Sequence, residues 1–300
     1  MLSIAWFLGL YLPLKLHGGI GPMFETLQLE GFQSMLTAPG LQSNGTRWTW
    51  SGFSSAVIIS SIGFSMWPHF FMKTFAAKDD RTMKLTVVLY PTFQLFLLPI
   101  LFIGFSAIVS FPGVEPADTI LPYVLRNMDL PVVLVGLVCA GTLAASMSSG
   151  DAILHAAGSV MVRDGLMKMS GLEAYFKQPN MERKVIRLCI LLISIIAYYF
   201  AVISTTDIVS LLLGAYGGVA QLFPLIFAMF YWPRATKEGA LSGLIIGVFV
   251  TLLFLYVPEW KPWDMHEGIY GLLANLIAFV GVSVSTPKTN QEIVDKFSQT

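Results

Sequence analysis

Charged residues are scarce in this sequence, and their scarcity excludes several classes of protein. Of the 300 residues only 12% are Asp, Glu, Lys or Arg, and the formal net charge is zero. In an ordinary soluble domain about 25% of the residues are charged. Nucleic-acid binding requires clustered Lys and Arg that displace the counterions of phosphates. We therefore expect no nucleic-acid partner.

Cysteine is also rare, since the chain contains only Cys139 and Cys189. Both lie within apolar runs, where a thiol behaves as a small buried hydrophobic group. Two such residues do not form the evenly spaced set that indicates a disulfide framework. The sequence therefore predicts no structural disulfide.

Hydrophobic residues, by contrast, make up 55% of the chain, and the mean hydropathy is +0.70. Apolar runs of about 20 residues can cross a ~30 Å hydrocarbon core. Lipid cannot satisfy an open strand edge, and no alternation of period two is visible, so we expect these runs to be helices. The predicted fold is all-α, a polytopic protein of the lipid bilayer with about eight transmembrane helices, at residues 2–18, 52–72, 84–111, 131–162, 185–204, 207–231, 239–257 and 267–285.

The basic residues predict how the chain is oriented, because Lys and Arg accumulate in short cytoplasmic loops. Four of the 18 basic residues fall on one predicted face, namely Lys15, Arg47, Arg126 and Lys261. The other face holds Lys73, Lys78, Arg81, Lys84, Arg163, Lys168, Lys177, Arg183, Lys184, Arg187, Arg234, Lys237, Lys288 and Lys296. We therefore expect a multi-pass cell-membrane protein with both termini of this chain in the cytoplasm.

A cluster of small and polar residues stands out within the span 131–162. In the stretch "GTLAASMSSGDAIL", Ala145, Ser148 and Ser149 are spaced i, i+3 and i+4, so they share one face of a helix. One interpretation is close helix packing, with each hydroxyl bonded to its own i−4 carbonyl. The other is a sodium site, in which the two hydroxyls and the Ala145 carbonyl, freed by a bend near Ser149, bind the ion weakly enough to release it.

Three ordered stretches resemble the sodium:solute symporter family. They are "GFSMWPHFFMKTFAAKD", "LAASMSSGDAILHAAGSVMVRD" and "AYGGVAQLFPLIFAMFYWPRATKEGALSGLIIG". The resemblance covers nearly the whole chain and implies a leucine-transporter type of fold, in which two inverted repeats of five helices meet at the membrane midplane. It also implies sodium as the coupling ion and a small-molecule solute.

Within that fold, residues 1–300 resemble part of a single transmembrane domain. Residues 1–18 resemble the fifth core helix, residues 52–231 the second inverted repeat, and residues 239–285 the peripheral helices. The first four core helices have no counterpart, so we expect a fragment of a full symporter, with the other half encoded separately, or an inactive truncated product. The face of Ser148 and Ser149 should then be open.

The resemblance implies that part of the solute-binding site lies on the span 52–72. Ser60, Phe64 and Trp67 are the candidate contacts there, and we expect the helix to be interrupted between Gly63 and Pro68, because Pro lacks an amide donor. A kink flanked by interfacial aromatics would give the same pattern. In a later span, Tyr216 is a further candidate for the solute cavity, whereas Gln221 could equally well tie two helices together.

Asp151 follows the serine pair, and a carboxylate there is expected to face the exit path of the ion. His155 lies one turn further on and could pair with it. Ser149, Asp151 and His155 also supply the residue types of a serine hydrolase, but on one helix their directions do not converge. A channel would need a selectivity filter, and none of the predicted spans contains a filter-like run of glycines. We therefore expect a symporter rather than an enzyme.

The nature of the solute is the least specific part of this interpretation. The "MWPH" segment is most similar to the monocarboxylate and pantothenate permease branch of the family, which implies a small carboxylate. No arginine stands deep within a predicted span to neutralise such an anion. An amino acid or another solute of the family remains an alternative, and a proton remains an alternative to sodium.

Overall fold

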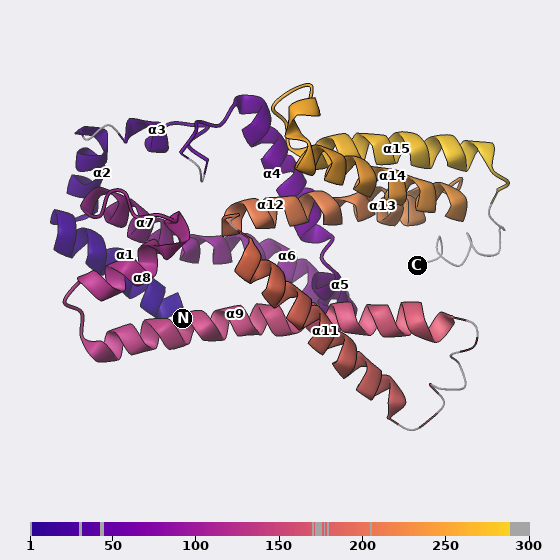
Figure 1. Cartoon of the computed structure of the whole chain (residues 1–300), viewed down its shortest axis with the longest axis horizontal. Coiled ribbons are helices and arrows are strands. Elements are labelled where there is room, and N and C mark those ends of the chain that lie inside the picture. The colour runs from indigo at the N-terminus through magenta and orange to yellow at the C-terminus, as the bar shows by residue number, and fades with distance from the viewer. Residues whose placement is uncertain are drawn as a thin grey trace. The chain divides into compact units, whose positions relative to one another are not determined.

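The structure is a computed structural model, and the described part of the chain is almost entirely helical (Figure 1). Within it, extended pairing is limited to one bridge between Leu41 and Arg47. The all-α prediction is therefore confirmed. The described residues are 2–29, 32–42, 45–169, 171, 176, 178, 180–204 and 206–288. Lys177 and Lys296, which the orientation prediction also used, lie outside them.

The chain folds as two compact units, each built from two separate stretches of sequence. The first unit comprises residues 1–33 and 68–205, and the second comprises residues 34–67 and 206–300. The helices of the first unit are α1 (Leu2–His17), α2 (Ile20–Leu29), α5 (Pro68–Phe75), α6 (Asp80–Gln94), α7 (Leu98–Ser110), α8 (Ile120–Asn127), α9 (Val132–Val160) and α11 (Met181–Ile203). Those of the second are α3 (Gln33–Leu36), α4 (Trp50–Ser65), α12 (Ile208–Val219), α13 (Phe223–Tyr231), α14 (Lys237–Tyr256) and α15 (Glu267–Ser285).

The core of the first unit forms where α1 packs against α7. The two helices approach so closely at Gly9 that an added Cβ would collide with Pro99. Short helices α2 and α8, which the sequence did not predict, pack against α7. The buried residues of this core are Leu8, Leu12, Ile103, Ala107, Val124, Leu125, Met128 and Val138.

A second contact in the first unit joins the long helix α9 to α11, which crosses it (Figure 1). A Cβ at Gly158 would lie 2.7 Å from Ile190 Cγ1, so glycine permits this close crossing. A single π-helical turn, Met161–Gly165, follows α9. Arg163 Nε then binds Glu182 Oε1 of α11 at 2.7 Å. The crossing and the ion pair together fix α11 against the end of α9.

In the second unit, α14 and α15 run side by side (Figure 1). Glycines at four-residue spacing on α14 make the close approach possible. A Cβ at Gly243 would lie 2.6 Å from Asn275 Oδ1 and 2.8 Å from Phe279 Cβ. At Gly247 it would lie 2.7 Å from Asn275 Cβ. This is the small-residue packing that brings membrane helices into backbone contact.

All eight predicted spans contain helix, and among the described residues six helical segments are long and apolar enough to cross a membrane on their own. These are residues 80–110, 132–168, 181–203, 208–231, 237–256 and 267–285. The remaining two are shorter, because α1 has 16 residues and the predicted span 52–72 is divided. In that span α4 ends at Ser65 and α5 begins at Pro68. The interruption predicted between Gly63 and Pro68 is confirmed.

Candidate functional site

The serine pair lies on α9, on a face that the described part of the first unit leaves open. Ala145, Ser148 and Ser149 are all exposed. Among the 18 most apolar consecutive residues of the helical stretch Val132–Lys168, only 6% are buried. Within the first unit, the described helices therefore do not cover the face that carries the serine pair.

The hydroxyls along α9 divide into two groups by their hydrogen bonds. Thr142 Oγ1 donates to the Val138 carbonyl at 2.9 Å, and Ser146 Oγ donates to the Thr142 carbonyl at 3.0 Å. The side-chain hydroxyls of Ser148 and Ser149, in contrast, make no hydrogen bond with any described residue. Packing with back-bonded hydroxyls accounts for Thr142 and Ser146. It does not account for Ser148 and Ser149, whose oxygens are available to a ligand.

The backbone around the serine pair differs from the expectation. Helix α9 is α-helical without interruption from Val132 to Val160, including the region of Ser149. Because the α-helical pattern pairs each carbonyl with the amide four residues on, the Ala145 carbonyl accepts from the Ser149 N–H. The expected bend was wrong, since serine and glycine are accommodated in a helix without breaking it. The Ala145 carbonyl keeps one lone pair for a further contact.

Asp151 is exposed one helical turn before His155, which is exposed as well. No ion pair joins them within the described chain. His155 Nδ1 instead lies 3.4 Å from Ser159 Oγ. Ser149, Asp151 and His155 thus do not form a hydrogen-bonded triad among the described residues, and the arrangement does not favour hydrolysis.

Two of the four candidate solute contacts meet in the second unit, where α4 crosses α12. A Cβ at Gly63 would lie 2.8 Å from the Tyr216 carbonyl oxygen and 3.0 Å from Tyr216 Cα. This contact brings the rings of Trp67 and Tyr216 to 6.2 Å, at an angle of 76°. Ser60 and Phe64 lie four residues apart on α4 and are half-buried, whereas Trp67 lies in the break between α4 and α5. Because residues four apart share one face of a helix, Ser60 and Phe64 lie on one side of α4.

Gln221, the alternative cavity residue, ties helices together. It is fully buried in a 3-10 turn, Ala220–Leu222, that separates α12 from α13. Its Nε2 donates to Thr251 Oγ1 of α14 at 3.2 Å and to the Gly268 carbonyl of α15 at 3.2 Å. In addition, Asn275 Nδ2 of α15 donates to the backbone carbonyl of Gln221 at 2.8 Å. Gln221 therefore links α12, α14 and α15.

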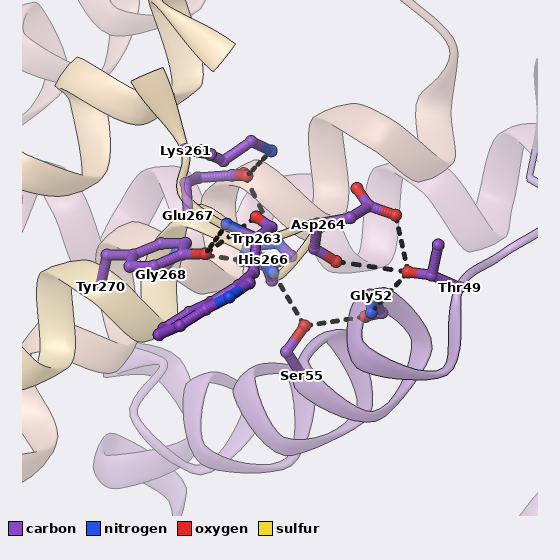
Figure 2. A network of polar contacts seen from close by, with 10 residues as sticks. All are labelled: Thr49, Gly52, Ser55, Lys261, Trp263, Asp264, His266, Glu267, Gly268 and Tyr270. Atoms are coloured by element: carbon purple, nitrogen blue, oxygen red, sulfur yellow. Dashed lines mark hydrogen bonds and ion pairs between the residues drawn. The ribbon is translucent and has the colours of Figure 1, made fainter. Parts of the chain in front are cut away.

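A second polar network, which the sequence did not predict, surrounds the N-terminus of α15 (Figure 2). Thr49 Oγ1 donates to Asp264 Oδ2 at 2.6 Å. The His266 N–H donates to Ser55 Oγ at 2.8 Å. These two contacts fasten the first turns of α4 to the segment that precedes α15.

The charged residues give no alternative metal centre. Within the described part of the chain, no group of three or more His, Cys, Asp or Glu side chains could hold a metal ion. The serine pair on α9 itself offers neutral hydroxyl oxygens. Hard cations accept hydroxyl and carbonyl oxygens of this kind.

Comparison with known proteins agrees, over most of the chain, with the family resemblance seen in the sequence. The sequence profile of the sodium:solute symporter family matches residues 32–247. The uncharacterized symporter YhjB of Bacillus subtilis is 31% identical over 99% of this chain and 61% of its own length.

Two further relatives carry more specific names. The high-affinity proline transporter PutP of Bacillus subtilis is 27% identical over 58% of this chain and 36% of its own length. The sodium/pantothenate symporter of Haemophilus influenzae is 28% identical over 71% of this chain and 44% of its own length. The chain thus spans less than two thirds of each of these three relatives.

Proposed function

The chain belongs to the sodium:solute symporter family, and from that premise we propose that it forms part of a transporter that moves a small organic solute across the membrane together with sodium. The observation that carries the proposal is the serine pair. Ser148 and Ser149 are adjacent, exposed hydroxyls on a membrane helix, and neither is bonded to a described residue. Hydroxyls left in that state within lipid are unfavourable unless they have another partner.

We propose that the partner is the transported sodium ion. Ser148 Oγ, Ser149 Oγ and the remaining lone pair of the Ala145 carbonyl supply three neutral oxygens at i, i+1 and i−3 on α9. Neutral ligands suit an ion that must also be released, because no carboxylate holds it tightly. They also favour sodium over a proton, since a hydroxyl does not titrate near neutral pH.

The remaining ligands are proposed to come from the first repeat of the fold. In leucine-transporter type folds, coupling ions bind near the midplane where the two repeats meet. This chain spans 61% of YhjB, and its helices resemble the fifth core helix, the second repeat and the peripheral helices. We propose that a first repeat, in the same polypeptide or encoded separately, completes the site. The distribution of Lys and Arg supports cytoplasmic placement of both termini of this chain.

Asp151 is proposed to attract the departing ion without binding it directly. Asp151→Asn should therefore lower the maximal uptake rate by roughly two- to fivefold, because an exposed charge interaction is worth up to about 1 kcal/mol. The sodium concentration for half-maximal uptake should change less than the rate. Initial uptake rates measured over a sodium series separate the two quantities, and a larger change in sodium affinity than in rate would place Asp151 among the ligands instead.

The solute is proposed to bind the surface formed by Ser60, Phe64, Trp67 and Tyr216. A ring pair of this geometry offers an apolar face, and the Ser60 hydroxyl offers a polar group. Both suit a small organic molecule with a carboxylate. The names of the relatives support two candidates, pantothenate and proline. A small carboxylate is the first choice, and an amino acid is the alternative.

Trp67→Ala tests this surface. The solute concentration for half-maximal uptake should rise by roughly two- to tenfold, because an aromatic contact is worth about 0.5–1.5 kcal/mol beyond its buried area. Trp260→Ala is the matched control, since Trp260 is 66% exposed and lies outside α4 and α12. Equal effects of the two substitutions would remove the assignment of Trp67 to the solute.

The proposed function as a whole is tested by uptake of radiolabelled solutes. The transporter that contains this chain would be reconstituted into liposomes and supplied with proline, pantothenate and short monocarboxylates. We expect one class to accumulate when sodium is present outside. Chemical conversion of a solute, without accumulation, would support an enzyme instead.

A further inference from the structure

His266 is a buried histidine at the junction of three helices of the second unit. It is the N-cap of α15, and its side chain is only 5% exposed. Figure 2 shows it between the Ser55 turn of α4 and the first residues of α15. The proposed transport mechanism does not use it. A buried, titratable group in such a position requires a physical explanation.

Three contacts make His266 a structural link. Its Nδ1 accepts a hydrogen bond from the Gly268 N–H at 3.0 Å, which caps α15. Its backbone N–H donates to Ser55 Oγ of α4. On α12, a Cβ at Gly217 would lie 3.1 Å from His266 Cε1, so the ring packs directly against that glycine. One residue thus touches α15, α4 and α12.

The capping bond determines where the neutral ring carries its proton. Because Nδ1 accepts from the Gly268 N–H, the proton of the neutral imidazole is on Nε2. Nε2 is buried and has no hydrogen-bond partner among the described residues. The Glu267 Oε1 atom is 3.6 Å away, which is too far for a hydrogen bond. A second proton must therefore go to Nδ1, the atom that caps α15.

The charged groups around the ring act in opposite directions. Burial lowers the pKa of His266 below its ordinary value, and nearby Lys261 lowers it further, whereas Glu267 and the Leu213 carbonyl of α12 raise it. Lys261 Nζ is itself 3.7 Å from Glu267 Oε2. The remaining carboxylate nearby, Asp264, is bonded to Thr49. The neutral ring is thus the favoured form in the closed structure.

We propose that His266 is a proton-sensitive latch, which holds α15 to α4 and α12 while Nδ1 is unprotonated and releases the N-terminus of α15 when Nδ1 takes up a proton. A protonated Nδ1 would place one N–H against the N–H of Gly268, so the capping bond cannot persist. The two groups repel each other, and the segment that carries the Ser55 and Thr49 contacts is freed with them.

The direction of the pH effect follows from linkage. The open segment exposes His266, which then binds a proton with the ordinary histidine pKa, whereas the closed form binds it less readily. The stability of the latch is therefore complete above the ordinary pKa of about 6.5. It is lost as the pH falls through that value toward the lowered pKa of the closed form. Acidification opens the latch.

The latch lies beside the proposed solute surface without depending on it. Gly217, against which the ring packs, follows Tyr216 directly in α12. Opening would loosen α12 at that point and α4 at Ser55. The argument for the latch uses only His266 and its contacts, so it stands even if the solute binds elsewhere.

Hydrogen exchange in detergent micelles tests the latch without any transport assay. We would measure exchange of the Gly268 amide at about pH 7.5 and about pH 5 in the wild-type chain and in His266→Asn. Asparagine is a strong N-cap that does not titrate in this range. The wild-type exchange rate divided by the variant rate should be roughly tenfold higher at the lower pH than at the higher pH. At the lower pH the open form of the wild type binds a proton on His266 more readily than the closed form does, whereas the variant has no such proton to bind.

Matched variants keep the test specific. His155→Asn removes an exposed histidine of the first unit and should leave the wild-type pH dependence of Gly268 exchange unchanged. His266→Ser, a second non-titrating cap, should reproduce the result for His266→Asn. In the wild type alone, exchange of Gly268 relative to Gly243, buried between α14 and α15, should rise on acidification. A wild-type ratio of Gly268 to Gly243 exchange that is the same at both pH values would overturn the proposal.

Discussion

Replacement of both Ser148 and Ser149 with alanine is expected to raise the sodium concentration for half-maximal uptake by roughly tenfold or more. Each serine contributes an exposed hydroxyl without a partner among the described residues, and the proposed site contains no carboxylate that could compensate. Leaving a bound group without its partner costs about 1–3 kcal/mol. Uptake rates at fixed solute, measured over a sodium series, give the value directly.

Ser146→Ala is the matched control for the double variant. Ser146 lies on the same helix and is also exposed, but its hydroxyl is bonded to the Thr142 carbonyl. Its loss should leave the sodium dependence unchanged. If the double variant kept the wild-type sodium dependence, or if Ser146→Ala shifted it equally, the serine pair would serve helix packing and not ion binding.

Gly271→Ala is expected to destabilise the second unit by about 1–3 kcal/mol or more. Gly271 is buried on α15, where an added Cβ would collide with Thr251 Oγ1 and lie 2.6 Å from the Gly247 carbonyl oxygen of α14. A backbone atom cannot move aside as a flexible side chain can. The added methyl group would separate α14 from α15 and stretch the bonds of Gln221. Thermal unfolding in detergent, followed by circular dichroism, measures the loss.

Gly281→Ala supplies the opposite case on the same helix. No atom of the described residues lies within 4 Å of a Cβ built at Gly281, and alanine is a better helix former than glycine by about 1 kcal/mol. This variant should be as stable as the wild type or slightly more stable. Equal stabilities for Gly271→Ala and Gly281→Ala would contradict the close packing of α14 against α15.

The membrane helices could be predicted because lipid leaves a long apolar run only one regular structure. The predicted span 267–285 agrees with α15 at both ends, and Pro68 marked the break after α4. The short helices α2 and α8, of 10 and 8 residues, were missed. They lie between the predicted spans, where an apolar run of about 20 residues is not required.

The polar contacts could be predicted only in part. Gln221 was recognised as a possible link because a polar side chain within an apolar membrane helix can bond to another helix, and its contact with α15 bears this out. His266 was missed because its partner Ser55 is 211 residues away in sequence. For the serine pair, helix spacing predicted the shared face, but only the structure distinguishes the bonded hydroxyl of Ser146 from those of Ser148 and Ser149.

The most direct test of the account compares ion gradients as driving forces for solute uptake. Liposomes containing the transporter would be given an inward gradient of sodium, of choline at the same ionic strength, or of protons in the absence of sodium. The account predicts accumulation of solute only with the sodium gradient, and loss of accumulation when an ionophore collapses that gradient. Equal accumulation with the proton gradient, or with choline, would contradict sodium coupling through Ser148 and Ser149.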